Sequence, residues 1–308
     1  MSAAHLSVIV CTYNRRDLLA GCLQSLGGQL LCPARFEVVV VDNNSDDDTA
    51  AVVARHRAML PNLRYVFEPT QGLSHARNRG SAVAVGTHLV YVDDDTRLPA
   101  TYLSCVLDTI ERNQPDLLGG PVYPFYTEAK PPWFKDHYEI RKYTEVSGFS
   151  TTCGVSGMNF VIRKDLLGHL GGFDPSLGMR GAEQGFGEER KVLETYRAVT
   201  PLDQQRVYYD LDCMVLHHVP RYKMRLSYIL GRGFRGGRML VAVTGRGATA
   251  KSFATLVIRY PRSFANVLRE AFGGGWRHLD SLQIARSLAI QAGKFVEAVR
   301  QLGRRLNS

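Results

Sequence analysis

The chain has 308 residues, 45% of them hydrophobic, so it can bury a substantial core, and this composition excludes a disordered protein. Residues 221–308 hold 17 Lys and Arg against three acidic residues, a balance of +14, which leaves −5 of the net charge of +9 for residues 1–220. We therefore expect a mildly acidic body followed by a strongly basic extension.

The cysteines and the start of the chain indicate the compartment. The six cysteines are scattered without a C-x-x-C pair, which favours reduced, buried thiols over a disulfide framework or a zinc site. The chain passes into strand-like sequence by Leu6 with no basic or long apolar leader, and no apolar run is long enough to span a bilayer. These features predict a cytoplasmic protein without a signal peptide.

The first half of the chain alternates strands with helices. A short apolar strand begins at Leu6 and ends in the polar loop CTYNRRD, and helical spacing follows over residues 17–26. A second apolar strand covers residues 36–41 and ends in Asp42, with a helix from about Asp48. Continuous apolar strands between amphipathic helices predict an α/β fold with a parallel sheet flanked by helices.

Polar residues follow these strands directly, where such sheets bind their ligands. Thr12, Tyr13 and Asn14 follow the first strand, and Asp42 ends the second. The next predicted helix, over residues 72–85, carries Arg77 and places it near a candidate phosphate site. The alternative for this helix is a solvent-facing basic surface, because arginines on helices are usually exposed.

An acidic triplet ends the third apolar strand. The stretch HLVYVDDDT runs from β-prone residues straight into Asp93, Asp94 and Asp95. In an extended segment Asp93 and Asp95 project to the same side, which suits a shared hard divalent cation bound through oxygen. The alternative is a solvated acidic turn in which Asp95 or Thr96 caps a following helix.

The motifs together resemble a known family. SVIVCTYNR, VVVVDNNSDD, GLSHARNRG and YVDDDT resemble the nucleotide-sugar-binding half of family 2 glycosyltransferases, which have the GT-A fold. VSGMNFVIRKDLLGHLGGFDPSLG and GFGEERKVLETYR resemble the acceptor half of the same family. The resemblance implies a GT-A catalytic domain over residues 1–220, with a donor half at 1–100 and an acceptor half at 101–220. Residues 221–308 are then a basic helical C-terminal extension.

The resemblance also implies a nucleotide site and a metal site. Thr12, Tyr13 and Asp42 are expected to contact the base and ribose, with Arg77 near the diphosphate or base. The whole predicted nucleotide site comprises Thr12, Tyr13, Asn14, Asp42, Arg77, Asp93 and Asp94. Asp93 and Asp95 correspond to the DXD motif, which holds Mn²⁺ or Mg²⁺ against the diphosphate. A cation there stabilises the negative charge that the leaving diphosphate gains.

A histidine is a candidate third metal ligand. His217 and His218 follow the strand-like segment LDCMVL, and some GT-A enzymes complete the metal shell with a histidine opposite the DXD motif. We name His218 as the predicted ligand, with His217 as the other candidate. The alternative is a structural role for both at the end of a strand.

A second acidic pair is the candidate catalytic base. Glu188 and Glu189 stand between Gly187 and an amphipathic helix, where the helix dipole alone favours acids. In the family these positions usually read Glu-Asp, and the second acid takes the proton from the acceptor hydroxyl. The resemblance therefore assigns the base to Glu189, with Glu188 as acceptor binder or rival base. Because this chain has Glu in place of Asp, the choice stays open.

An aromatic segment and the tail complete the predictions. Residues 121–147 are rich in aromatics and prolines, and Trp133 is a candidate to stack on an acceptor sugar, or else to pack on the core. Residues 221–238 are basic and interrupted by glycines. Helical spacing follows over residues 251–272, where Pro261 should break or kink the helix, and over 278–306. Such helices suggest docking on the inner face of the cell membrane, and a hairpin packed on the catalytic domain or a second subunit is the alternative.

The expected function is that of a metal-dependent, inverting glycosyltransferase that moves a sugar from a nucleotide-sugar to an acceptor hydroxyl. A UDP-sugar donor follows from the resemblance, in which Asp42 accepts from the uracil imide. The acceptor would be a glycan or a lipid-linked glycan in bacterial surface or exopolysaccharide assembly. Alternatives are a nucleotidyltransferase, although its glycine-rich, lysine-containing N-terminal loop is missing, and a non-catalytic nucleotide-binding protein. No nucleic-acid motif is present, so that partner is not expected.

Overall fold

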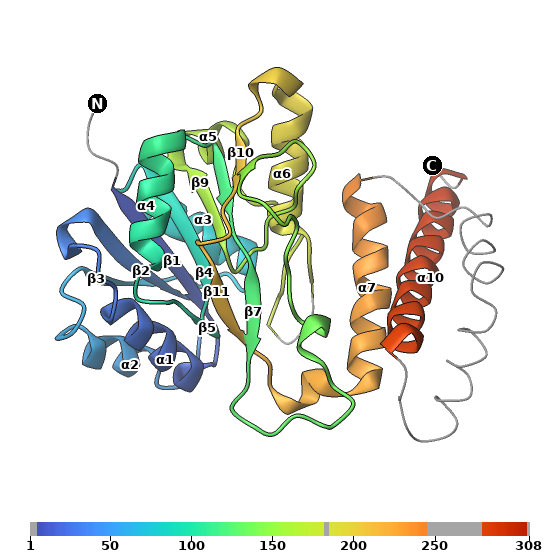
Figure 1. Ribbon diagram of the computed structural model, residues 1–308, viewed down its shortest axis with the longest axis horizontal. Coiled ribbons are helices and arrows are strands. Elements are labelled where there is room, and N and C mark those ends of the chain that lie inside the picture. Colours follow the sequence, from blue (N-terminus) through green and yellow to red (C-terminus); the bar gives the residue numbers. More distant parts are fainter. Residues whose placement is uncertain (1–4, 182–184, 245–278, 307–308) are drawn as a thin grey trace. The chain divides into compact units, whose positions relative to one another are not determined.

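The computed structural model describes residues 5–181, 185–244 and 279–306 (Figure 1). The chain forms two compact units. The first contains residues 1–125 and 139–218, and the second contains residues 126–138 and 219–308.

The first unit is built on a sheet of eight strands. Their order is β3-β2-β1-β4-β9-β6-β10-β8. Strands β3, β2, β1 and β4 are parallel, which confirms the predicted parallel arrangement for this part of the sheet. Strand β9 is antiparallel to both of its neighbours, so the whole sheet is mixed. The strands are β1 (Leu6–Thr12), β2 (Phe36–Asp42), β3 (Leu63–Phe67), β4 (His88–Asp93), β6 (Leu117–Gly119), β8 (Gly148–Phe149), β9 (Phe160–Arg163) and β10 (Val207–Tyr209).

Helices bury both faces of this sheet. Alternate residues of a strand point to opposite faces, so Val8 and Val10 of β1 join one apolar core while Ile9 joins the other. The first core includes residues of α1 (Arg16–Gly27), α2 (Thr49–His56) and α4 (Tyr102–Asn113). The second includes residues of α3 (Leu73–Val83), α5 (Lys164–His169) and α6 (Glu188–Val199). Because both faces are covered, the central strands are apolar over most of their length, and the α/β prediction is confirmed.

A small second sheet lies in the same unit. It has the order β5-β11-β7, with β5 (Thr96–Arg97), β11 (Val215–His218) and β7 (Val122–Phe125). Strand β11 is antiparallel to β5, with His217 opposite Thr96. After the acidic triplet the chain therefore enters a strand, and the alternative in which Asp95 or Thr96 caps a helix is wrong. This pairing returns both histidines to the acidic triplet from more than a hundred residues away.

Two long helices dominate the second unit. Helix α7 (Leu226–Thr244) and helix α10 (Leu279–Leu306) lie side by side (Figure 1). Helix α10 confirms the predicted helix over residues 278–306, whereas the predicted helix over 251–272 falls outside the described residues. Helix α7 runs through the glycines that were expected to interrupt it. None of the described helices combines the length and the apolarity that crossing a bilayer requires.

The glycines of this helix pair allow close backbone contact. A Cβ built on Gly237 would lie 2.0 Å from the carbonyl oxygen of Ile290, and one on Gly293 would lie 1.9 Å from that of Phe234. Only residues without a side chain fit at these two positions. The glycines therefore serve helix packing, and this gain offsets their weak helix propensity.

Short 3₁₀ turns and an aromatic cluster complete the fold. The turns are η1 (Pro33–Arg35), η2 (Asp136–Tyr138), η3 (Leu202–Gln204) and η4 (Arg221–Met224). In the second unit Phe134 and Tyr138 form an apolar cluster with Val219, Met224 and Ile229. Trp133 packs edge-on against Phe134, with ring centroids 5.7 Å apart.

Candidate active site

Polar residues predicted to bind the nucleotide gather at one edge of the large sheet. Thr12 at the end of β1 is opposite Asp42 at the end of β2, and Cys11 is opposite Asp93 at the end of β4. Because parallel strands end at the same edge, these three strand ends form one surface.

Asp42 is buried and oriented by its neighbours. Its Oδ2 accepts a hydrogen bond from the Tyr65 hydroxyl at 2.7 Å, and its Oδ1 accepts one from the Ser45 backbone N–H at 2.9 Å. Burial and the hydrogen bond to Asp42 raise the pKa of Tyr65 to about 12, so this hydroxyl stays a donor. The carboxylate is therefore held as a fixed acceptor at the sheet edge.

Asn14 joins the loops that follow β1 and β2. Its backbone N–H donates to Ser45 Oγ at 3.0 Å, and its Oδ1 accepts from the Asp46 backbone N–H at 2.9 Å. Asn14 has a φ of +52°, a conformation that asparagine adopts more readily than most residues. Asn14 thus fixes the shape of the predicted nucleotide site. Tyr13, the residue before it, is half-buried.

The acidic triplet divides into one accessible and two buried carboxylates. The side chain of Asp93 is 32% exposed, whereas those of Asp94 and Asp95 are 4% and 6% exposed. Asp94 accepts from the Thr12 hydroxyl at 2.8 Å and from Arg15 at 3.1 Å. Burial raises the pKa of Asp94 to about 7, with attraction to Arg15 opposing and repulsion from Asp95 adding to the shift. A bound cation would relieve this crowding.

The two histidines face different neighbours. His217 Nε2 lies 3.6 Å from Asp95 Oδ2. The ring of His218 lies against Phe125 with centroids 5.3 Å apart, while its backbone N–H donates to the Asp95 carbonyl at 2.9 Å. The imidazole of His217 therefore lies close to the acidic triplet.

Arg77 connects the two acidic groups. Its Nη1 donates to Glu188 at 2.8 Å, and its Nη2 lies 3.4 Å from Asp93 and donates to the Gly157 carbonyl at 3.1 Å. The side chain is only 3% exposed, so the alternative of a solvent-facing arginine is wrong. One guanidinium thus holds together acids that are separated by more than ninety residues of sequence.

Glu188 and Glu189 begin helix α6 but differ in accessibility. Glu188 is 5% exposed, and burial raises its pKa to about 7, with repulsion from Glu189 adding to the shift and attraction to Arg77 opposing it. Glu189 is partly exposed. A Cβ built on Gly157 would lie 3.3 Å from the Glu189 carboxyl carbon and 2.8 Å from Arg77 Nη2. The Glu189 carboxyl group and the Arg77 guanidinium therefore both lie against the backbone of Gly157.

A cavity lies beside Glu188. Its volume is about 430 Å³, and a Cβ built on Gly178 in its wall would lie 3.3 Å from the Glu188 carboxyl group. The cavity is lined by Gly72, Pro175, Ser176, Leu177, Gly178, Met179, Arg180 and Gly185. Such a volume accommodates a small polar ligand such as a sugar.

Sequence reasoning missed several residues of this site. Arg15 contacts both Asp94 and Asp95. Its position in the loop after the first strand could have indicated that it belongs to the site. Asn43 accepts from the Gly72 backbone N–H at 2.7 Å and donates to the Thr70 carbonyl at 2.7 Å, which fixes the start of α3. Gly157 lies in the small-residue segment VSGMNF but carried no signal for its contact with Arg77. Trp133 belongs to the second unit and its aromatic cluster.

The fold, with polar residues at its strand ends and acids that converge on Arg77, is that of a GT-A type α/β enzyme. Residues 7–171, more than half of the chain, match the family model described as "Glycosyl transferase family 2". The chain therefore belongs to glycosyltransferase family 2 and is a glycosyltransferase. The predictions of family, fold class and enzyme class are confirmed.

Relatives and solved structures agree with this assignment. The chain is 24% identical over 239 residues to glucosyl-dolichyl phosphate glucuronosyltransferase of Haloferax volcanii, covering 75% of this chain and 74% of the relative. It is 28% identical over 241 residues to succinoglycan biosynthesis protein ExoM of Rhizobium meliloti, covering 76% and 73%.

The similarity to solved structures extends over nearly the whole chain. Mannosyltransferase PcManGT from Pyrobaculum calidifontis, in complex with GDP-Man and Mn²⁺, has a TM-score of 0.65 and 18% identity, with 98% of this chain and 88% of that chain covered. TarS 1–349 of S. aureus, in complex with UDP-GlcNAc, has a TM-score of 0.57 and 17% identity, with 96% and 92% covered. At these identities the similarity shows the fold.

Proposed function

We propose that this chain is a metal-dependent, inverting glycosyltransferase that transfers a sugar from a nucleotide-sugar to a hydroxyl of a glycan or lipid-linked acceptor. The observation that carries the proposal is the contact of Arg77 with both Asp93 and Glu188. It supports a single site in which the acids on the donor side and the acceptor side act together.

The donor end of the site suits a nucleotide. Asp42 offers a fixed carboxylate to the N–H groups of a base, and Thr12, Tyr13 and Asn14 surround the same strand ends. A UDP-sugar is the first candidate, since the uracil imide presents one N–H to such an acceptor. PcManGT binds GDP-Man and TarS binds UDP-GlcNAc, so both nucleotides belong in the test.

The acidic triplet suits a hard divalent cation. Asp93 and Asp95 provide carboxylate oxygens, the ligands that Mn²⁺ and Mg²⁺ prefer, and Asp94 adds negative charge beside them. When bound, the cation neutralises charge on the leaving diphosphate. Arg15 and Arg77 supply two further positive charges at the triplet. The short distance to Asp95 supports His217 as an added ligand in place of His218.

Glu189 is the proposed base. Its partial exposure allows an acceptor hydroxyl to reach it, whereas Glu188 is buried and bound to Arg77. The raised pKa of Glu188 is near that of an effective base, so it remains the rival, but its main task is to position Arg77. Direct attack by the activated hydroxyl, without an enzymic nucleophile, inverts the anomeric centre. Trp133 stays a proposed acceptor contact on the second unit.

The test separates donor binding from transfer. Glu189→Gln should lower transfer by at least about 100-fold, because the proton of the acceptor loses its base. Its stabilisation by UDP-, GDP- and dTDP-sugars with Mn²⁺ should match wild type in thermal-shift assays, because the nucleotide and metal groups are unchanged. Transfer is measured as nucleoside diphosphate release with a panel of glycoside acceptors.

The matched control is Glu194→Gln on the same helix, where Glu194 pairs with Arg190 at 3.3 Å. This variant should keep both binding and transfer. Transfer near the wild-type rate in Glu189→Gln would reject the assignment, and no response to any sugar nucleotide with Mn²⁺ would reject the proposed donor site.

A further inference from the structure

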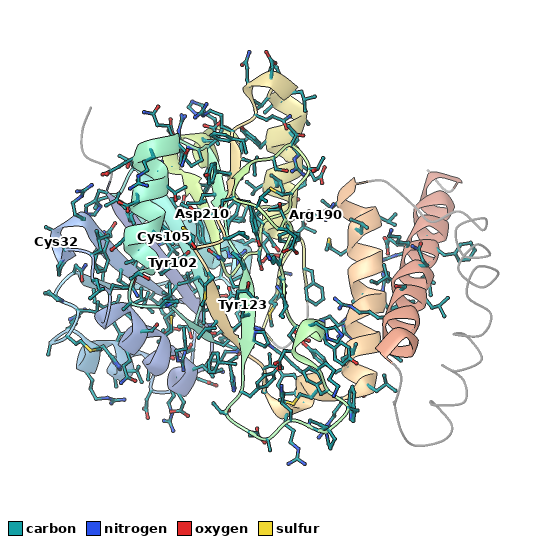
Figure 2. All side chains as sticks on the ribbon, viewed as in Figure 1. Cys32, Tyr102, Cys105, Tyr123, Arg190 and Asp210 are labelled. Atoms are coloured by element: carbon teal, nitrogen blue, oxygen red, sulfur yellow. The ribbon has the colours of Figure 1, made fainter. Side chains whose placement is uncertain are left out.

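A cluster of thiols and a carboxylate lies apart from the acidic triplet in sequence. In the described part of the chain, Cys105, Asp210 and Cys213 place one ligand atom each so that all three atoms lie within 4.8 Å of one another. Cys105 lies on α4, and the other two lie in the turn between β10 and β11 (Figure 2 labels Cys105 and Asp210). The spacing along the chain contains no C-x-x-C pair, so the sequence did not predict this meeting.

The surrounding structure holds Asp210 and the backbone of Cys213 in place. Asp210 accepts hydrogen bonds from the Thr109 hydroxyl, from the Asp212 backbone N–H at 3.1 Å and from Ser147 Oγ at 3.4 Å. The Cys213 carbonyl accepts from Asn159 Nδ2 at 2.8 Å. Cys213 is 1% exposed and Asp210 is 9% exposed, while Cys105 is partly exposed. Hydrogen bonds therefore fix Asp210 and the backbone of Cys213, and Cys105 is the most exposed of the three residues.

The ligand chemistry selects a thiophilic ion. Two sulfurs and one oxygen suit Zn²⁺, whereas Mn²⁺ and Mg²⁺ prefer oxygen. A tetrahedral ion with Zn–S bonds of about 2.3 Å places its sulfurs roughly 3.8 Å apart. A separation of at most 4.8 Å therefore closes to this geometry with side-chain shifts of about 1 Å.

We propose that Cys105, Asp210 and Cys213 bind one Zn²⁺, with a water molecule as the fourth ligand on the side of Cys105. The site is structural. The ion joins helix α4 to the turn that leads into β11, the strand that carries His217. It is distinct from the carboxylate site of Asp93 and Asp95.

The binding step releases protons. Hydrated Zn²⁺ keeps one water ligand and releases the others, it forms two Zn–S bonds and one Zn–O bond to Asp210, the two S–H bonds break, and both protons leave to solvent. Burial, together with the neighbouring Cys105, holds the pKa of Cys213 well above its usual range, so this thiol is protonated before the ion binds. The apparent affinity for Zn²⁺ should therefore rise as the pH rises through the neutral range.

The experiment uses the full chain with Co²⁺ and Zn²⁺ as probes. Protein purified in a phosphine reductant is stripped with a chelator and titrated with Co²⁺. One equivalent should produce a thiolate-to-cobalt charge-transfer band and the visible bands of a tetrahedral ion, and Zn²⁺ should displace it. Cys105→Ser and Cys213→Ser should each abolish the charge-transfer band of the pair and weaken Zn²⁺ binding by more than about 100-fold.

Cys153→Ser is the matched control, because Cys153 is a buried cysteine outside the cluster, and it should retain the spectrum and the affinity. A wild-type protein without the charge-transfer band, or a band that survives in both cluster variants, would overturn the proposal. So would a zinc affinity that does not change with pH. If Cys213→Ser fails to fold, Cys105→Ser and the spectrum of the wild-type protein still test whether the cluster binds the ion. None of these readouts depends on glycosyl transfer.

Discussion

At the residue scale, the site depends on a few buried charges that compensate one another. Arg77 neutralises part of the charge of Asp93 and Glu188, and Arg15 does the same for Asp94 and Asp95. Burial outweighs this compensation and raises the pKa of both Glu188 and Asp94 to about 7. Shifted carboxyl pKa values are typical of active sites, because several acids are held there close together and away from water.

His217 provides a prediction at this scale. His217→Ala should weaken Mn²⁺ binding in the presence of UDP by about 10-fold or more, because it removes an imidazole beside Asp95. His218→Ala should stay close to wild type, since the ring of His218 packs on Phe125. Calorimetric titration of Mn²⁺ into the UDP complex measures both. Equal losses, or a larger loss in His218→Ala, would contradict the assignment to His217.

At the element scale, single elements have unexpected tasks. Strand β11 pairs with β5 and so returns the histidine pair to the acidic triplet. Helix α6 begins with Glu188 and Glu189, which places both acids at the positive end of its dipole. In the second unit, Gly237 and Gly293 let α7 and α10 approach until backbone meets backbone.

The helix pair gives a second prediction. Gly237→Ala should destabilise the second unit by roughly 1–3 kcal/mol, because the new Cβ would meet the Ile290 carbonyl and force the helices apart. Gly236→Ala is the matched control, since its Cβ meets nothing within 4 Å, and it should stabilise the same helix by up to about 1 kcal/mol. Urea unfolding followed by circular dichroism compares the two. Equal stability changes would show that the close approach is not formed in solution.

At the scale of the whole molecule, charge is strongly divided. Residues 221–308 carry +14, against −5 for residues 1–220. Contact with an anionic membrane surface is therefore a proposal for the extension, where lipid-linked acceptors would be found. Each Lys or Arg close to such a surface contributes roughly 1 kcal/mol, and salt screens the attraction.

This division gives a third prediction. The full chain should co-float with vesicles that contain anionic lipid at low salt, and it should dissociate at high salt because counterions screen the basic extension. Neutral vesicles of the same size are the control and should leave the protein unbound. Flotation in a density gradient measures the bound fraction. Equal binding to neutral vesicles would show that charge does not drive the contact.

The sequence alone determined the elements and the kind of chemistry. Apolar runs and helical spacing are local patterns, so they located the strands β1, β2 and β4 and most helices, but not β3, which is only partly buried. In a parallel sheet the strand ends share an edge, so Asp42 and Asp93 could be assigned to one site in advance. The motifs around these acids also indicated the family.

Only the tertiary structure decided which residues meet. The contact of Arg77 with Glu188, that of His217 with Asp95, and the meeting of Cys105 with Cys213 all join positions more than a hundred residues apart. The strand order and the crossover connections determine these contacts. The local periodicity of the sequence specifies neither of them. The same holds for the glycines of α7. The sequence alone predicted that they interrupt a helix, whereas in the structure Gly237 lies at the contact with α10.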